Sequence, residues 1–227
     1  MVQRFVAPSI PPLENGDRLN REEFERRYNA MPENVKAELI NGIVYMASPV
    51  RVLQHGDPHG DLLAWFGQYR LFTPGVRSPI ASTIRFDDTN EPQPDAVLMI
   101  DPDKGGQAEY DKFGYLTQAP ELVAEISAST TSYDLHAKRD LYLQFRVREY
   151  LVWRVLDNAI DWFIRRGDRF ELIDEVDGIR ESEIFPGLWL DSAALIASDL
   201  PAMFRVIQLG VASTEHAAFL KRLGASA

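Results

Sequence analysis

The sequence predicts a mixed α/β domain with β-hairpins near its ends and a strand–helix–strand unit between them. Two hairpin signals and one central strand–helix–strand pattern support this prediction. The central pattern covers residues 120–155, and a helix between two strands favours a parallel crossover. The hairpin signals are Asn41-Gly42 near one end and Gly167-Asp168 near the other, each between two segments rich in β-forming residues.

The chain begins with a segment that is expected to be extended. Pro8, Pro11 and Pro12 fall within its first 18 residues. Asn20 is a typical helix N-cap, and Glu23 stands three residues later in the capping-box position, so a short helix is expected over residues 21–30.

The next elements are a hairpin and a longer helix. Strands over 35–40 and 43–47 flank the Asn-Gly pair, which favours a type I′ turn, and Ser48-Pro49 closes the second strand. Apolar spacing then indicates a helix over about 52–70, although Gly56, Pro58 and Gly60 leave its early part open.

The remaining elements follow from alternation, periodicity and turn residues. They are strands over 77–86, 94–100, 120–127 and 149–155, a helix over 133–146, a hairpin of 160–166 with 169–173, a turn and short strand over 185–190, and a helical tail from 194.

Composition excludes several classes of protein. The 227 residues include no cysteine, which excludes disulfide scaffolds, thiol nucleophiles and iron–sulfur clusters. No apolar run approaches the roughly 18–20 residues that span a bilayer, so we expect no membrane association and a cytoplasmic location. The formal net charge of −10 makes the chain as a whole a poor non-specific binder of nucleic acid.

Three carboxylates stand within or at the start of apolar strands. Glu125 lies in the middle of one strand, Asp95 just inside the start of another, and Glu38 in the first strand of the Asn-Gly hairpin. An ionised carboxylate there is costly unless it is paired or bound to a cation. Carboxylate oxygens suit Mg²⁺ or Mn²⁺. Salt bridges or solvated edge positions are the alternative reading of each residue.

A lysine and two histidines complete the set of candidates. Lys138 follows Glu125 by 13 residues on the next helix, where it could stabilise charge on a phosphate or orient a water, or simply form an i,i+4 pair with Asp134. His55 and His59 have metal-like spacing, but the glycines and proline around them argue against a rigid helix and hence against a metal site.

Taken in order, these residues resemble the Uma-two family, which is grouped with restriction endonucleases in the PD-(D/E)xK nuclease superfamily. The resemblance covers about residues 20–190. The matching segments are Ala37-Glu-Leu-Ile-Asn-Gly-Ile-Val, Ser48-Pro49, His55, Gln93-Pro-Asp-Ala-Val, Pro120-Glu-Leu-Val-Ala-Glu-Ile-Ser-Ala-Ser-Thr, Asp134, Lys138, Tyr142, Glu149-Tyr150 and Phe185-Pro-Gly-Leu.

The resemblance implies a restriction-endonuclease-like core, which is a mixed β-sheet flanked by helices, with the β-hairpins at its periphery. It also implies that Asp95 and Glu125 are metal ligands, that Lys138 is the catalytic lysine and that Glu38 is a further acidic residue of the catalytic site. The wider superfamily has its lysine two residues after the glutamate, where this chain has Ser127, but the family resembled places that lysine on the next helix. Arg146-Val-Arg-Glu-Tyr-Leu differs from the family's usual Gly-Val-Pro-Glu-Tyr-Trp-like segment.

We therefore expect an extended arm over 1–19, a restriction-endonuclease-like domain over 20–190 and a helical extension over 191–227. The function expected is a Mg²⁺- or Mn²⁺-dependent endonuclease acting on DNA, in a homodimer. Two alternatives stay open. One is a non-catalytic nucleic-acid-binding or dimerisation module on the same scaffold. The other is a glycosidase in which Glu38 and Glu125 act as acid and base.

Overall fold

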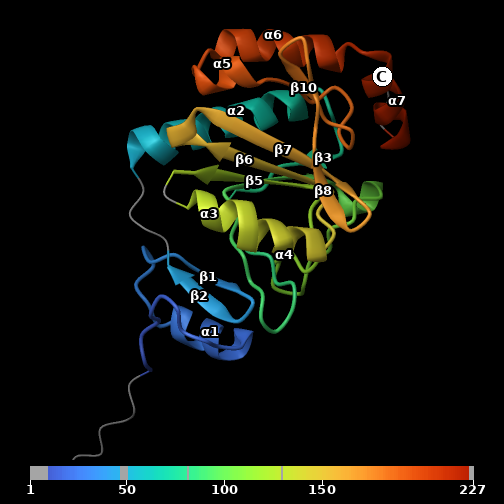
Figure 1. Cartoon of the computed structure of the whole chain (residues 1–227). Helices are drawn as coiled ribbons and strands as arrows, with labels where there is room; N and C mark the ends of the chain where they lie inside the picture. Colours follow the sequence, from blue (N-terminus) through green and yellow to red (C-terminus); the bar gives the residue numbers. More distant parts are fainter. Residues whose placement is uncertain (1–9, 47–50, 81, 129, 225–227) are drawn as a thin grey trace, which may run out of the picture.

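The computed structural model describes residues 10–46, 51–80, 82–128 and 130–224, and its centre is a six-stranded sheet (Figure 1). The strands, in spatial order, are β3 (Val76–Arg77), β4 (Ala96–Ile100), β5 (Leu122–Ser127), β6 (Glu149–Arg154), β7 (Ala159–Arg166) and β8 (Arg169–Leu172). Strands β5 and β6 are parallel and the other neighbours are antiparallel. The mixed sheet and its parallel crossover are therefore confirmed.

The crossover from β5 to β6 covers one face of the sheet. It consists of α3 (Thr131–Tyr133), a π-helical turn η3 (Asp134–Lys138) and α4 (Arg139–Gln144). Leu141 and Tyr142 from this crossover pack on Val123 and Val152 of the sheet, and all four side chains are buried. This packing fixes the direction in which the first turns of the crossover lie over the end of β5.

The opposite face is covered by helices from two distant parts of the chain (Figure 1). Helix α2 (Asp57–Leu71) lies there with α5 (Ser192–Ile196), α6 (Leu200–Val211) and α7 (Thr214–Arg222). Trp65 of α2 packs edge-to-face on Trp162 of β7, with ring centroids 5.5 Å apart. Ile207 and Phe219 join the same core, so the C-terminal helices are continuous with it.

The N-terminal unit comprises α1 (Arg21–Tyr28) and the hairpin of β1 (Ala37–Ile40) and β2 (Ile43–Met46), and lies on the side of the sheet that carries α3 and α4 (Figure 1). The Asn20 side chain accepts a hydrogen bond from the Glu23 amide, as a helix N-cap should. Asn41 and Gly42 have φ values of 51° and 73°, which fit the type I′ turn. Both predictions are confirmed.

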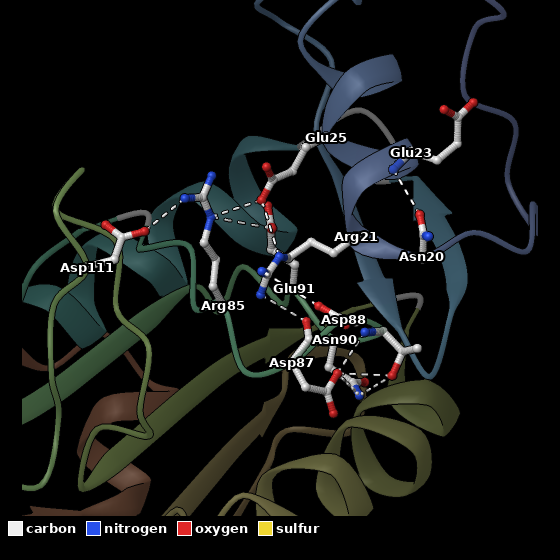
Figure 2. Close-up of polar contacts among 11 residues, drawn as sticks. Asn20, Arg21, Glu23, Glu25, Arg85, Asp87, Asp88, Asn90, Glu91 and Asp111 are labelled. Carbon is white, nitrogen blue, oxygen red and sulfur yellow. Dashed lines mark hydrogen bonds and ion pairs between the residues drawn. The ribbon is translucent and has the colours of Figure 1, made fainter.

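Polar contacts join this unit to the rest of the protein (Figure 2). The Arg85 guanidinium lies 3.0 Å from Glu25 of α1 and also donates to Asp111 at 2.9 Å. The buried carboxyl of Glu91 lies beside it, 3.6 Å from the Arg85 Nε. Arg21 donates to the carbonyl of Asp87 at 3.1 Å. The hairpin is joined to the same segment by its backbone, since Leu39 and Glu91 exchange N–H···O hydrogen bonds of 3.2 and 2.7 Å.

The structure corrects the predicted strand over 77–86. Only β3 at its start belongs to the sheet, and Ile80 and Ile84 then make isolated bridges to Ala96 and Leu116. Pro79 lacks the amide hydrogen that a continuous ladder needs, so the ladder is interrupted after β3, and Ile80 meets Ala96 as a single bridge in the same register.

The segment before α2 is helical as well. The π-helical turn η1 (Val52–Gly56) continues directly into α2, and Pro58 stands in the first turn of α2, where no amide hydrogen is required. The helix expected over about 52–70 is therefore confirmed, including its early part, and the argument against a rigid helix around His55 and His59 is wrong. Ser48-Pro49 and residues 1–9 lie outside the described residues. None of the described helices is long and apolar enough to cross a membrane.

A small sheet of β9 (Glu175–Val176), β10 (Ile179–Glu181) and β11 (Trp189–Asp191) completes the fold. The short strand expected over 185–190 corresponds to β11, and the helical tail is confirmed. The turn before β11 brings Gly187 against Gly210 of α6, where a Cβ on Gly210 would stand 2.3 Å from the Gly187 carbonyl oxygen.

Candidate active site

Two of the predicted acidic residues come from neighbouring strands. Strands β4 and β5 pair with Ala96 opposite Ala124 and Val97 opposite Val123, so the same register sets Asp95 opposite Glu125. Residues that lie opposite each other project to the same face of a sheet. Both side chains line a cavity of about 1240 Å³ between the sheet, the N-terminal hairpin and the crossover.

The Asp95 carboxylate is held by two donors. Its Oδ1 lies 3.1 Å from the His55 Nε2, and its Oδ2 accepts the backbone N–H of Ile126 at 2.7 Å. Burial raises the pKa of Asp95, but the hydrogen bond and charge of His55 and the Ile126 amide outweigh burial, so that this pKa lies below its usual value. Asp95 is therefore ionised over the physiological pH range.

Glu125 and Lys138 meet at the floor of the cavity. The Lys138 ammonium lies 3.0 Å from the Glu125 Oε1 and 2.9 Å from the Glu38 Oε1. The Tyr142 hydroxyl also donates to the Glu125 Oε1, at 2.9 Å. Side-chain exposure is only 4% for Glu125 and 5% for Lys138, against 19% for Glu38. All four residues predicted for the site, Glu38, Asp95, Glu125 and Lys138, thus lie in one cavity.

The π-helical turn sets where Lys138 points. Lys138 ends this turn, and its ion pairs go to Glu38 and Glu125 rather than to Asp134 four residues earlier. The Asp134 carboxylate instead accepts the Thr130 hydroxyl at 2.6 Å. Among the described residues, Asp134 and Lys138 therefore do not form the i,i+4 ion pair that was the alternative interpretation.

Negative charge is in excess at this floor. Glu38, Asp95, Glu125 and Asp134 line the cavity together with Lys138. Burial, followed by the charges of Asp95, Asp134 and Glu38, raises the pKa of Glu125 well above its usual value, against the opposing charge of Lys138. Burial lowers the pKa of Lys138, but the carboxylates of Glu125 and Glu38 outweigh it, and the amine stays protonated.

Two histidines belong to the site although the sequence argument gave them little weight. His55 and His59 stand four residues apart across η1 and α2, and both touch Asp95. His55 contacts the carboxylate, and the His59 Nε2 lies 2.8 Å from the Asp95 carbonyl oxygen. Their i,i+4 spacing was the available signal, because such residues share one helix face. Tyr142, which reaches Glu125 from α4, carried no comparable chemical signal.

The donor set fits a hard divalent cation. Every described hydrogen bond to the Glu125 carboxylate goes to Oε1, so Oε2 has no partner among the described residues. Two carboxyl groups on neighbouring strands match the way Mg²⁺ is held, by one or two carboxylates while it keeps several waters. Among the described residues, no group of three or more acidic or histidine side chains is arranged to hold a metal ion by itself.

The mixed sheet with its crossover and acidic cavity defines a nuclease-like α/β protein. A family model described as "Uma2: Putative restriction endonuclease" matches residues 21–193, and the chain belongs to this family. The resemblance seen in the sequence is thereby confirmed.

The structure also resembles a solved one. The crystal structure of "a putative nuclease belonging to DUF820 from Anabaena variabilis" aligns with a TM-score of 0.51 at 15% identity, covering 80% of this chain and 97% of that one. At this identity the likeness concerns the fold. No curated protein matches the chain.

Proposed function

We propose that this protein is a metal-dependent endonuclease that hydrolyses phosphodiester bonds in DNA. Family membership and a nuclease-like fold support the nuclease assignment. The observation that carries the metal dependence is the pairing of Asp95 and Glu125 on one face of the sheet, with the Lys138 ammonium 3.0 Å from the Glu125 carboxylate.

Asp95 and Glu125 are the residues that would hold Mg²⁺ or Mn²⁺. When bound, such an ion would neutralise charge on the phosphate and would lower the pKa of a water molecule at the site. The protein's own contribution is orientation. His55 and the Ile126 amide hold the Asp95 carboxylate in place, while Lys138 and Tyr142 hold the Glu125 carboxylate.

Lys138 acts as a fixed positive charge in this proposal. Because its amine stays protonated, it stabilises negative charge that develops on the phosphate rather than removing a proton from water. Glu38 fixes the ammonium from the other side, and its Oε2 accepts the Gln93 amide at 3.0 Å. Glu38 therefore couples the N-terminal hairpin to the reacting centre.

The glycosidase alternative would also need aromatic side chains against which a sugar could stack beside Glu38 and Glu125. Trp65, Trp153 and Trp162 are instead buried in the core that contains α2. Glu38 and Glu125 both bind the Lys138 ammonium.

Substitution of the carboxylates tests the proposal. We expect Glu125→Gln and Asp95→Asn to lower the rate of Mg²⁺- or Mn²⁺-dependent cleavage of plasmid DNA by at least about 100-fold, since each removes one charged ligand. Isothermal titration with Mn²⁺ should show weaker binding in both variants. Glu171→Gln is the matched control, because Glu171 is 41% exposed on β8 and lines no part of the cavity.

Two outcomes would contradict the proposal. If Glu125→Gln cleaved DNA as fast as the wild type in the presence of metal, the assignment of Glu125 as a metal ligand would be wrong. Binding of DNA by the wild type without cleavage under any divalent cation would favour the non-catalytic module instead.

A homodimer forms part of the same proposal. Closed two-fold symmetry is the commonest arrangement of soluble homo-oligomers. Sedimentation equilibrium of the full chain should give twice the monomer mass of 25.8 kDa. A monomer at all concentrations tested would remove this part of the proposal without affecting the site.

A further inference from the structure

The reacting groups lie deep, and this depth restricts the shape of any substrate. Glu125 and Lys138 are 4% and 5% exposed at the floor of the 1240 Å³ cavity. A duplex presents its phosphates on a wide, stiff cylinder, and its second strand travels with them. A single strand can bend a phosphate into a recess, and enzymes that work inside a pocket act on single-stranded or extruded nucleotides.

Cationic and apolar side chains occur together among the outer lining residues. Lys36 and Arg51 line the cavity and are exposed, and they supply positive charge in a chain of net charge −10. Leu156 lines the same cavity and is 61% exposed. Val52 and Leu53, in the same helical turn as the lining residue His55, are 68% and 79% exposed.

An aromatic pair extends this apolar character into the cavity. Tyr45 from the N-terminal hairpin and Tyr133 from the crossover both line it, with ring centroids 4.2 Å apart. The Tyr133 hydroxyl is buried and has no hydrogen-bond partner among the described residues. Apolar and aromatic surface beside a few cations is the chemistry that binds unpaired bases joined by phosphates.

We propose that the cavity takes a single-stranded DNA segment, with phosphates at Lys36 and Arg51 and unpaired bases against Leu156, Tyr45 and Tyr133. The inference rests on the proposed nuclease function and specifies its substrate. A duplex, by contrast, demands a broad basic surface, since its affinity comes largely from neutralising many phosphates. Two fixed cations suffice for a short single strand, whose affinity also draws on base stacking.

Binding is measured separately from cleavage. Asp95→Asn in the full chain, with Mg²⁺ present, is titrated against a fluorescein-labelled 12-nucleotide single strand, the same sequence as a blunt duplex, and the same sequence as RNA. We expect the single-stranded DNA to bind at least about ten-fold more tightly than the duplex, because stacking contributes only where bases are unpaired. The slope of log K against log salt should be about −1 to −2, as two phosphate contacts on a single strand predict.

Surface variants assign the binding to this cavity. In the same background, Leu156→Ser and Arg51→Gln should each weaken single-strand binding about five- to ten-fold. The matched controls are Leu172→Ser, 58% exposed on β8, and Arg77→Gln, 51% exposed on β3, and both should leave binding unchanged.

The outcomes are distinct. Equal or tighter binding of the duplex, tighter binding of the RNA, or insensitivity to both Leu156→Ser and Arg51→Gln would overturn the single-strand inference. If the wild type cleaves duplex DNA in that case, the nuclease proposal survives alone. If the single strand binds as expected but the wild type cleaves nothing with Mg²⁺ or Mn²⁺, the nuclease proposal fails while the binding assignment stands.

Discussion

Glu91 shows at the level of one residue how the N-terminal unit is tied to the sheet. It lies buried between Glu25 and Arg85, with Arg21 nearby (Figure 2). Burial, followed by the hydrogen bond and charge of Glu25, raises the pKa of Glu91 to about 8, against the opposing charges of Arg85 and Arg21. The native protein therefore keeps a proton on Glu91 at pH values where the unfolded chain has lost it.

The sign of the resulting pH dependence follows from this proton. Between the unfolded pKa of about 4.5 and the folded pKa of about 8, the native state binds the extra proton, so the free energy of unfolding falls as pH rises. Glu91→Gln removes this contribution. We expect its stability relative to the wild type to increase by about 2–3 kcal/mol between pH 5.5 and 7.5.

Urea denaturation at the two pH values measures the effect. Glu109→Gln, an exposed carboxyl elsewhere, serves as the control and should follow the wild type. A constant difference between Glu91→Gln and the wild type at both pH values would show that Glu91 is ionised in the native protein.

At the level of elements, the hairpin of β1 and β2 carries Glu38 into the cavity, so its turn matters to the site. Gly42 has a φ of 73°, and a Cβ there would stand 3.3 Å from the Leu19 carbonyl oxygen. Gly42→Ala should therefore destabilise the protein by roughly 1–2 kcal/mol, the cost of a left-handed conformation for an L-residue.

Gly67 provides a matched comparison for this prediction. It lies within α2, and a Cβ there would meet nothing within 4 Å. Gly67→Ala should stabilise the protein by about 0.5–1 kcal/mol because alanine loses less conformational entropy in a helix. Thermal unfolding of the two variants should move in opposite directions. A lower Tm for Gly67→Ala, or an unchanged Tm for Gly42→Ala, would contradict the geometry.

Local chemistry explains which elements could be predicted from the sequence. The hairpin turn, the Asn20 cap and the strand–helix–strand crossover depend on neighbouring residues, and the structure has all three. The segment after β3 was predicted poorly because its partners, Ala96 and Leu116, are distant in the chain. The early part of the helix expected over 52–70 was left open because of its glycines and proline, yet these residues are tolerated before and within a first turn.

The residues of the site likewise fall into those that local sequence could predict and those that depend on distant packing. Asp95 and Glu125 were recognisable because a carboxylate in an apolar strand needs a partner. The contacts of His55 and His59 with Asp95 depend on how α2 packs over the sheet, and no local sequence pattern specifies that packing. The contact of Tyr142 with Glu125 likewise requires the π-helical turn and α4 to be in register with β5.

At the level of the whole molecule, the core extends beyond the family match. The match ends at residue 193, yet Met203, Ile207 and Phe219 from α6 and α7 are buried against the same cluster as the sheet. Gly187 and Gly210 let the turn before β11 meet the backbone of α6 closely. The C-terminal helices therefore close one face of the sheet instead of standing apart from it.

This arrangement predicts that sheet and C-terminal helices unfold together. Ile207→Ala should cost about 2–5 kcal/mol because Ile207 is fully buried, whereas Leu209→Ala, at a 64% exposed position of the same helix, should change stability by less than about 0.5 kcal/mol. Tryptophan fluorescence reports on the strands and on α2, which together contain Trp65, Trp153, Trp162 and Trp189, and far-ultraviolet circular dichroism reports on the helices. In the wild type and in Ile207→Ala the two signals should trace one coincident transition. An early loss of helix signal while the fluorescence stays native would instead show that residues 191–227 fold as a separate unit on a sheet that is stable without them.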